Sequence, residues 1–367
     1  MRLLLLSCNT GGGHNTAATA LKKCFEEHGV ECDTMDALLF ASKMHSVVIS
    51  GAHSCLYRYF PRLNGAGYRY EESHPPRFFY RQVALGAKRF AAFLADRHYD
   101  GIVATHVFGN MLVTEARKKY GITIPHYAVI TDYALWPGTN MVDAQRFFIA
   151  SEQLRNIHIE AGIDAERLVA SGIPIHSDFL NAPDKQQARK KLGLNPEGKV
   201  VLLISGSIGC GKLNIKAPEF EKKMPENTQL VIICGRNERL YKQVKEKCSD
   251  KTIVIGFTDR IVEYMAAADL CVTKPGGLST TEAWAIGLPM ILMLSIPGCE
   301  THNMEHFTAL NIAMGTDDWD DAIQMTTELI QDDERLSEMR KQMVSVGFPG
   351  GTEVVVETVL SDLAQQG

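Results

Sequence analysis

The sequence lacks any long apolar run. None of its 367 residues lies in a stretch approaching the roughly 18 apolar residues of a membrane-spanning helix. The leucine run at residues 3–6 leads directly into polar residues, so we interpret it as a buried first strand and not as a signal peptide. We therefore expect a globular protein.

Paired cysteines are missing as well. Nine cysteines are spread along the chain at irregular spacings, and none belongs to a Cys-x-x-Cys pair. The odd count and the spacing argue against a disulfide or zinc framework and favour reduced thiols in the cytoplasm. The glycine-rich loops also lack the dinucleotide-binding fingerprint and the Gly-Lys-Ser/Thr of a P-loop.

Strand and helix patterns alternate twice along the chain, which is too long for one ordinary core. The predicted fold class is α/β, with two Rossmann-like domains, because such alternation is typical of parallel sheets covered on both faces. We expect domains at 1–173 and 199–349, a linker at 174–198, and a final helix at 352–364 that packs back on the first domain. The expected strands are 2–7, 30–35, 101–105, 126–131, 146–150, 168–170, 200–205, 229–234, 252–255, 270–273 and 290–294. Helical segments are expected at 14–28, at about 41–60 and 76–97, and up to 120.

The most informative segment is 274–303. A strand ends there in a Pro-Gly-Gly turn, and a helix is expected from about Ser279. Gly276 and Gly277 let backbone N–H groups approach a ligand, and a helix start suits a phosphate. Ser279 and Glu282 could instead form a capping box that only stabilises the helix.

Carboxylates and an amide complete this segment. Glu282 lies one turn into the helix, where it can accept hydrogen bonds from sugar hydroxyls. Glu300 and Asn303 follow the next strand, at the same edge of the sheet. A second glycine-rich strand exit, which contains Gly206 and Gly209, could line a pyrophosphate. Together these features predict a nucleotide-sugar site.

The first strand is followed by Gly11-Gly12-Gly13-His14. This loop lies at the carboxyl end of a parallel strand, where ligands bind in such sheets. His14 could take a proton from an acceptor hydroxyl near neutral pH. The alternative is a histidine that only caps its own helix.

Two short patterns suggest metals. His302-Asn-Met-Glu305-His306 matches an inverted zinc-peptidase motif, but no third ligand is evident, so we favour a polar helix start. Asp318-Trp-Asp320 resembles a metal-binding pair, although its acidic neighbours indicate the first turn of a helix. We expect no metal site from either pattern.

Acidic residues are scarce between Lys43 and Arg97. This window, called the basic window below, holds nine basic and three acidic residues, a net charge of +6 in a chain whose total is −5. Eight tyrosines and phenylalanines lie among them between residues 57 and 80. Such a composition suits peripheral contact with an anionic membrane, and also nucleic acid or an ordinary solvated helix pair.

The segment from Gly256 to Asn303 closely resembles the family of bacterial diacylglycerol glucosyltransferases and plant monogalactosyldiacylglycerol synthases, and the similarity extends over nearly the whole chain. The Gly-Gly-Gly-His loop and the strand exit at 234–237 match as well. The resemblance implies a GT-B fold, in which two Rossmann-like domains face one another across a cleft. It implies a donor site for a UDP-sugar made of Gly206, Gly209, Arg236, Phe257, Gly276, Gly277, Ser279, Thr280, Glu282, Glu300 and Asn303.

The same resemblance implies an inverting transfer of a hexose to diacylglycerol or a glycolipid. His14 would be the base, with Asp132 supporting the acceptor side, and neither a cofactor nor a bound metal would be required. The basic window would dock on the anionic inner face of the cell membrane, and no nucleic acid is expected as a partner. Cys299 stands where the family usually has glutamine, so the sugar stays open between glucose, galactose and GlcNAc. Another acceptor, such as that of a cell-envelope GlcNAc transferase, and an inactive lipid- or nucleotide-binding homologue remain alternatives.

Overall fold

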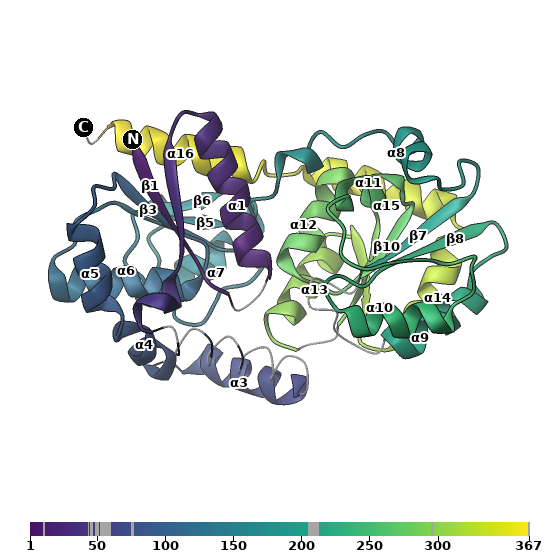
Figure 1. Cartoon of the computed structure of the whole chain (residues 1–367), viewed down its shortest axis with the longest axis horizontal. Coiled ribbons are helices and arrows are strands. Elements are labelled where there is room, and N and C mark those ends of the chain that lie inside the picture. Colours follow the sequence, from purple (N-terminus) through teal and green to yellow (C-terminus); the bar gives the residue numbers. More distant parts are fainter. Residues whose placement is uncertain are drawn as a thin grey trace. The chain divides into compact units, whose positions relative to one another are not determined.

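The computed structural model describes the chain except residues 10–11, 43, 45–46, 48–50, 52–59, 75–76, 205–212, 295–296 and 366–367. The chain divides into two compact units, each drawn as a sheet with helices on both faces (Figure 1). The first unit contains Met1–His176 and Pro349–Gly367, and the second contains Ser177–Phe348.

The first unit is built on a six-stranded parallel sheet with the order β2-β1-β3-β4-β5-β6. Its strands are β1 (Arg2–Ser7), β2 (Glu31–Asp36), β3 (Gly101–Ala104), β4 (His126–Val129), β5 (Arg146–Ile149) and β6 (Leu168–Ala170). The central strands are buried along most of their length, as parallel strands covered on both faces must be.

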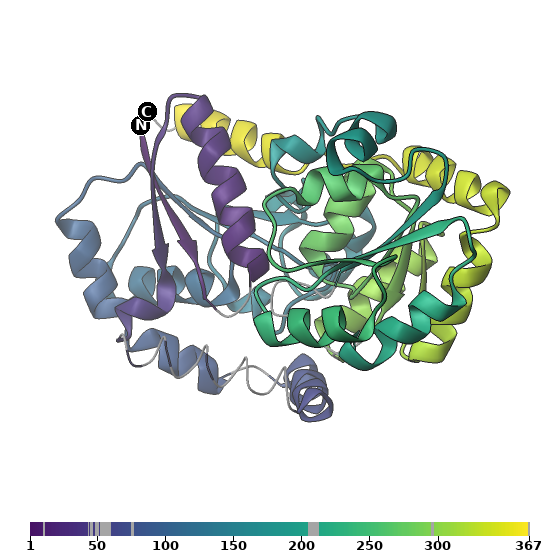
Figure 2. The ribbon, with the colours of Figure 1, turned by 45° about the vertical axis from the view of Figure 1, so that its right-hand side comes forward.

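Side chains of alternate residues of β1 point to opposite faces of this sheet. Leu3 and Leu5 pack with α1 (Gly12–Glu27) and the C-terminal helix α16 (Thr352–Ala364), which lie side by side in both views (Figures 1 and 2). Leu4 and Leu6 pack with the helices of the opposite face. Besides α1 and α16, the first unit contains the helices α3 (Pro61–Ser73), α4 (Arg77–Ala84), α5 (Ala87–Ala95), α6 (Val107–Tyr120) and α7 (Arg155–Glu160).

The second unit has the same architecture, with the strand order β12-β11-β10-β7-β8-β9. Its strands are β7 (Lys199–Ile204), β8 (Thr228–Ile233), β9 (Ile253–Ile255), β10 (Leu270–Thr273), β11 (Met290–Met293) and β12 (Ala313–Thr316). β12 is not among the strands expected from the sequence, because its four residues include Gly315 and carry little strand signal. The helices are α8 (Lys185–Leu192), α9 (Leu213–Lys223), α10 (Glu238–Lys247), α11 (Ile261–Ala267), α12 (Gly277–Ile286), α13 (Cys299–Ala309), α14 (Trp319–Leu329) and α15 (Asp333–Val346).

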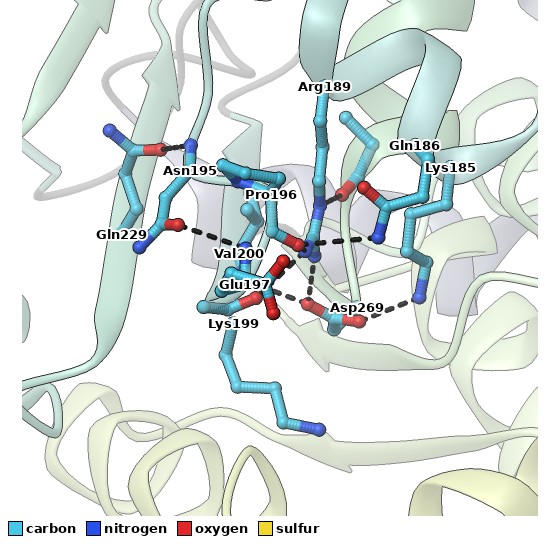
Figure 3. A network of polar contacts seen from close by, with 12 residues as sticks. Lys185, Gln186, Arg189, Asn195, Pro196, Glu197, Lys199, Val200, Gln229 and Asp269 are labelled. Carbon is cyan, nitrogen blue, oxygen red and sulfur yellow. Dashed lines mark hydrogen bonds and ion pairs between the residues drawn. The ribbon is translucent and has the colours of Figure 1, made fainter.

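Residues 177–198, expected as a linker, are grouped with the second unit. The side chain of Arg189 on α8 is buried and pairs with Asp269 at 2.6 Å. It also donates to the carbonyls of Ala267, Pro196 and Gly198 (Figure 3). These bonds fix α8 against the start of β7, which the prolines and polar composition of the segment did not indicate.

The chain returns to the first unit beside Gly172. This glycine has a φ of 83°, and a Cβ there would lie 2.7 Å from Pro349 Cγ. Gly351 N donates to the carbonyl of Ser171, and the Thr352 hydroxyl donates to that of Ile175. A side chain at Gly172 would therefore obstruct the return of α16.

Two helices were expected in the basic window; one lies mostly outside the described residues, and the other is divided in the structure. Most of the helix expected at 41–60 lies outside the described residues, and α3 begins only at Pro61, whose fixed φ suits a first helical position. The helix expected at 76–97 is divided into α4 and α5. Within the described part of the chain, no helix is long and apolar enough to cross a membrane.

Candidate functional site

The predicted donor residues of the second unit follow neighbouring parallel strands. Arg236 comes after β8, Phe257 after β9, Gly276 after β10, and Glu300 after β11. Parallel strands end at one edge of a sheet, which is therefore the ligand-binding edge of the unit. Gly206 and Gly209, which follow β7 in the sequence, lie outside the described residues.

The start of α12 offers free backbone donors. The helix begins at Gly277, with Gly276 as its N-cap, two residues earlier than expected. Because the first turn of a helix has no internal partners for its N–H groups, those of Gly277, Leu278 and Ser279 are available to an anion. Gly276 has ordinary extended backbone angles (φ −82°, ψ 137°), so the backbone does not require glycine there.

This helix start rules out the capping-box interpretation. Ser279 is the third residue of α12 and not its N-cap, so it cannot pair with Glu282 in a capping box. The Thr280 side chain is fully buried, and its hydroxyl donates to the carbonyls of Gly276 and Gly277. Thr280 therefore stiffens the turn, whereas Ser279 remains partly exposed.

Glu282 lies in the middle of α12 and is partly exposed. Within the described residues its carboxyl group makes no hydrogen bond or ion pair, and desolvation by the surrounding protein raises its pKa to about 8. A carboxyl group held in this way can accept hydrogen bonds from ligand hydroxyls. Its position at the ligand-binding edge favours a binding role, since no contact of its carboxyl group within the described residues stabilises the fold.

Glu300 is buried beside Lys274. One of its carboxylate oxygens pairs with Lys274 Nζ, and the other, Oε2, has no hydrogen-bond partner among the residues that the structure describes. Asn303, one turn further along α13, is fully buried and donates from Nδ2 to the carbonyl of Pro275 at 2.9 Å. Lys274 was overlooked as a site residue, although it begins the motif. Its ion pair ties the β10 turn to α13.

Arg236 and Phe257 stack on one another. The guanidinium carbon of Arg236 lies 3.9 Å from the centroid of the Phe257 ring, and both side chains are exposed. An exposed aromatic ring with a cation on one face presents a flat surface to a planar ligand. The structure thus brings into contact two residues that are 21 positions apart in the sequence and follow different strands, β8 and β9.

His14 belongs to the other unit, at the start of α1. Its Nδ1 lies 3.1 Å from the carbonyl oxygen of Thr105 and 2.7 Å from the hydroxyl oxygen of Thr131. A carbonyl oxygen can only accept, so the arrangement assigns the proton to Nδ1 and leaves the lone pair on Nε2. The Thr105 hydroxyl also donates to the carbonyl of His14. Thr105 and Thr131 were not singled out from the sequence.

Burial lowers the pKa of His14 below its ordinary value, while the negative charge of Asp132 and the hydrogen bond to Thr105 act in the opposite direction. Asp132 is buried, and its Oδ2 accepts a hydrogen bond from Trp136 Nε1 at 3.0 Å. The structure therefore gathers the two predicted catalytic residues at the carboxyl ends of β1 and β4. His14 is neutral near pH 7, as a general base must be.

A small cavity of ≈ 20 Å³ adjoins His14. This volume is enough for about one water molecule. Apolar surface makes up most of its lining, and polar side chains contribute the rest beside the base. The lining includes His14, Thr105, His106, Asn110, Thr131 and Trp136.

The metal patterns considered in the sequence do not form sites among the described residues. His302 lies on α13 and pairs with Glu305 at 3.3 Å, and no third ligand joins them. Asp318 is the N-cap of α14 and accepts from the N–H groups of Asp320 and Asp321. The interpretation of that acidic cluster as a first helical turn is confirmed.

The basic window is only partly described. Large apolar side chains are exposed at Leu63, Tyr70 and Leu85, each with about three-fifths of its surface accessible (62%, 63% and 60%). Leu63 and Tyr70 belong to α3, and Leu85 lies between α4 and α5. Basic residues are exposed at Arg69 on α3, Arg81 on α4 and Lys88 on α5. Lys43 and Arg58 lie outside the described residues.

Two family models match the chain. Residues 14–175 match monogalactosyldiacylglycerol (MGDG) synthase, and residues 200–349 match the glycosyltransferase family 28 C-terminal domain. A protein of Bacillus cytotoxicus named processive diacylglycerol beta-glucosyltransferase is 28% identical over 98% of this chain and 94% of its own length.

Solved structures share the fold. MurG of Acinetobacter baumannii has a TM-score of 0.64 at 16% identity, covering 98% of this chain and 99% of its own. HepE of Anabaena, solved in complex with UDP-glucose, has a TM-score of 0.59 at 15% identity and covers both chains fully (100%). These matches confirm the resemblance stated from the sequence: the chain is a GT-B glycosyltransferase that combines a first half of the monogalactosyldiacylglycerol synthase type with a family 28 C-terminal domain.

Proposed function

We propose that this chain transfers a hexose, with inversion, from a UDP-sugar to diacylglycerol or a related glycolipid. The observation that carries the proposal is the start of α12 at the ligand-binding edge. There, within the described residues, backbone N–H groups without partners are followed by the carboxyl group of Glu282, which has none either. The curated relatives named for diacylglycerol glucosylation span nearly the whole chain and support the acceptor class.

The donor would lie along the edge of the second sheet. The N–H groups of Gly277, Leu278 and Ser279 would bind the diphosphate, since a helix start stabilises negative charge. Glu282 would accept hydrogen bonds from the ribose hydroxyls. The stacked pair of Arg236 and Phe257 would meet the uracil ring, and Gly206 and Gly209 would border the pyrophosphate.

The sugar would lie near the buried carboxylate of Glu300. Its Oε2 accepts no hydrogen bond from the described part of the chain and would be available to a sugar hydroxyl, while Lys274 holds the other oxygen. Asn303 keeps the β10 turn in place through the carbonyl of Pro275 and would also border the sugar. A buried acceptor without a partner is costly, and a ligand hydroxyl would offset that cost.

In the transfer step the acceptor oxygen forms a bond to the anomeric carbon as the bond from that carbon to UDP breaks. His14 Nε2 takes the acceptor proton, and Asp132 stabilises the imidazolium that results. The charge that develops on UDP would be stabilised by the helix start, so the chemistry proposed here requires no bound metal.

We further propose that the protein works at the inner face of the cell membrane. The exposed apolar and basic side chains of α3, α4 and α5 support this, because a lipid acceptor must be reached from an interface. The same surface would contact anionic lipid headgroups and no nucleic acid.

A donor scan tests the proposed function. UDP release would be measured with UDP-glucose, UDP-galactose and UDP-GlcNAc, each with diacylglycerol liposomes and without acceptor. We expect release with one hexose donor that depends on diacylglycerol. Release that requires UDP-GlcNAc would favour the cell-envelope alternative, and binding of UDP without release from any donor would favour the inactive homologue.

A further inference from the structure

Three side chains of types that bind metals meet at the contact between α1 and α16, near the end of α1, whereas the proposed base His14 lies near the start of α1. Cys24 and His28 are one helical turn apart at the end of α1, and Glu353 lies in the first turn of α16. One potential ligand atom from each lies within 4.8 Å of the other two. We propose that these residues bind a zinc ion that clamps the C-terminal helix to the first unit.

The separation of the ligand atoms suits zinc. Cys24 Sγ and His28 Nδ1 lie 4.0 Å apart. Zinc–sulfur and zinc–nitrogen bonds in a tetrahedral site would place these atoms about 3.6 Å apart, so a small side-chain rotation closes the gap. His28 Nδ1 also lies 2.9 Å from the carbonyl oxygen of Cys24, to which it donates when no metal is bound.

The chemistry of the three ligands favours zinc over a hard cation. A thiolate and an imidazole are the ligands that zinc prefers, whereas calcium and magnesium take oxygen ligands. On binding, the Cys24 thiol releases its proton to solvent, and the thiolate and the Glu353 carboxylate balance the charge of the ion. A water molecule completes four-fold coordination.

The surroundings of the cluster are acidic and open on one side. Carboxylates of Glu353, Glu27 and Glu357 all act electrostatically on the Cys24 thiol. Their negative charge would attract a cation. Cys24 itself is buried, whereas His28 and Glu353 are exposed, so an ion can enter from solvent to reach the thiol.

The position of the cluster gives the ion a structural role. In the sequence, α16 is separated from the rest of the first unit by the whole of the second unit. It packs into the core of the first unit through Val355, Val356 and Val359. An ion held by Glu353 and by α1 would join the two ends of the sequence. Zinc would therefore stabilise the first unit without taking part in sugar transfer.

The test is a titration of the reduced, metal-free full-length chain with Zn²⁺, followed by competition with a chromophoric chelator. Co²⁺ serves as a spectroscopic probe, because a thiolate ligand gives it a charge-transfer band. We expect one equivalent of tight binding, a thiolate band with Co²⁺, and a higher melting temperature with Zn²⁺. His28→Gln and Glu353→Gln change exposed side chains and should leave the fold intact.

Each of these two variants should weaken Zn²⁺ binding by about 100-fold or more, since even an outer partner of a zinc ligand contributes about 10–100-fold. Cys24→Ser should abolish the Co²⁺ thiolate band. The controls are Cys32→Ser, at a buried cysteine on β2, and His98→Gln, at an exposed histidine; both should bind as the parent does. Absence of tight binding in the parent chain, or equal affinity in the ligand variants and the controls, would overturn the proposal.

Discussion

At the scale of single residues, His14 illustrates how burial and charge select a base. Burial lowers the pKa of its imidazole, and the carbonyl of Thr105 fixes the proton on Nδ1. The other nitrogen is then free to accept a proton at neutral pH. Asp132 compensates for part of the burial, so the imidazolium formed in the reaction is stabilised once it appears.

Glu282 should make donor binding depend on pH. Its pKa is raised to about 8 by burial, so the carboxyl group is mostly protonated at pH 7. The carboxylate can accept hydrogen bonds from two ribose hydroxyls through both oxygens, so we expect UDP affinity to rise as the pH increases toward 8 and then to level off. Isothermal titration of UDP at several pH values measures this.

Glu282→Gln provides the comparison, because glutamine does not titrate. Its UDP affinity should be lower above pH 8 and nearly independent of pH. The free energy of unfolding of the unliganded protein should change in the opposite sense. The pKa of Glu282 is higher in the folded than in the unfolded protein, so its contribution to stability is lost as the pH rises from about 4.5 to 8. A parent and a variant with the same pH profile would contradict this role.

The residues of the site differ in how far the sequence reveals them. His14 follows a strand exit of the first unit, and Glu282, Glu300 and Asn303 follow strand exits of the second. The strand pattern is therefore enough to place each of them at the carboxyl edge of the sheet of its own unit. Thr105 and Thr131 are separated from His14 by 91 and 117 positions. No local pattern reports such a contact, which depends on the order of strands in the sheet.

At the scale of elements, the start of α12 decides between a structural and a functional interpretation. The sequence placed the helix start near Ser279, where a capping box with Glu282 would have been possible. In the structure the helix starts at Gly277, and the hydroxyl of Thr280 stabilises the first turn in place of a cap. The difference of two residues frees Glu282 for a ligand.

Helices α4 and α5 should mediate membrane binding. We expect Arg81→Ala combined with Lys88→Ala to weaken binding to anionic liposomes, measured by cosedimentation, by roughly 30-fold, since each basic residue near such a surface contributes about 1 kcal/mol. Binding of the parent chain should also fall with added salt, because salt screens exposed charges.

The matched control is Lys245→Ala combined with Lys247→Ala, which removes two exposed charges from α10 of the second unit. Its liposome binding should equal that of the parent chain. Equal losses in both double variants would indicate a general charge effect, and binding that salt leaves unchanged would contradict an electrostatic contribution.

At the scale of the whole molecule, each unit includes a helix that lies at or beyond the edge of its main stretch of sequence: α16 in the first unit and α8 in the second. α16 returns after the second unit to fill the first, and its apolar period and the glycines before it made that helix predictable. α8 was not predictable as part of the second unit, because six of its eight residues are polar, and Arg189, one of its two buried residues, attaches it through polar contacts that no sequence pattern reports.

That arginine should matter to stability. Among the described residues, Arg189→Met would leave Lys185 as the cation partner of Asp269. It would also remove the Arg189 donor from the carbonyls of Ala267 and Gly198, whereas the carbonyl of Pro196 would keep Gln186 Nε2. Loss of one member of a buried ion pair costs about 3–5 kcal/mol. We expect urea denaturation to show this loss and hydrogen exchange to place it in the second unit.

Arg335→Met is the control, because Arg335 and Glu338 form an exposed ion pair on α15. Such a pair contributes about 0–1 kcal/mol. If the two variants lost the same stability, or if Arg189→Met lost protection mainly in the first unit, the role assigned to the Arg189 network would be wrong.

The central claim is that His14 removes the acceptor proton while the second unit holds the UDP-sugar. The most direct measurement compares the parent chain with His14→Gln, with glycolipid formed on diacylglycerol liposomes and UDP affinity measured on the same preparations. The account predicts a loss of glycolipid formation of about 10²-fold or more, since general base catalysis contributes about 10²–10⁴-fold, with UDP affinity unchanged. Glycolipid formation at the parent rate would contradict it.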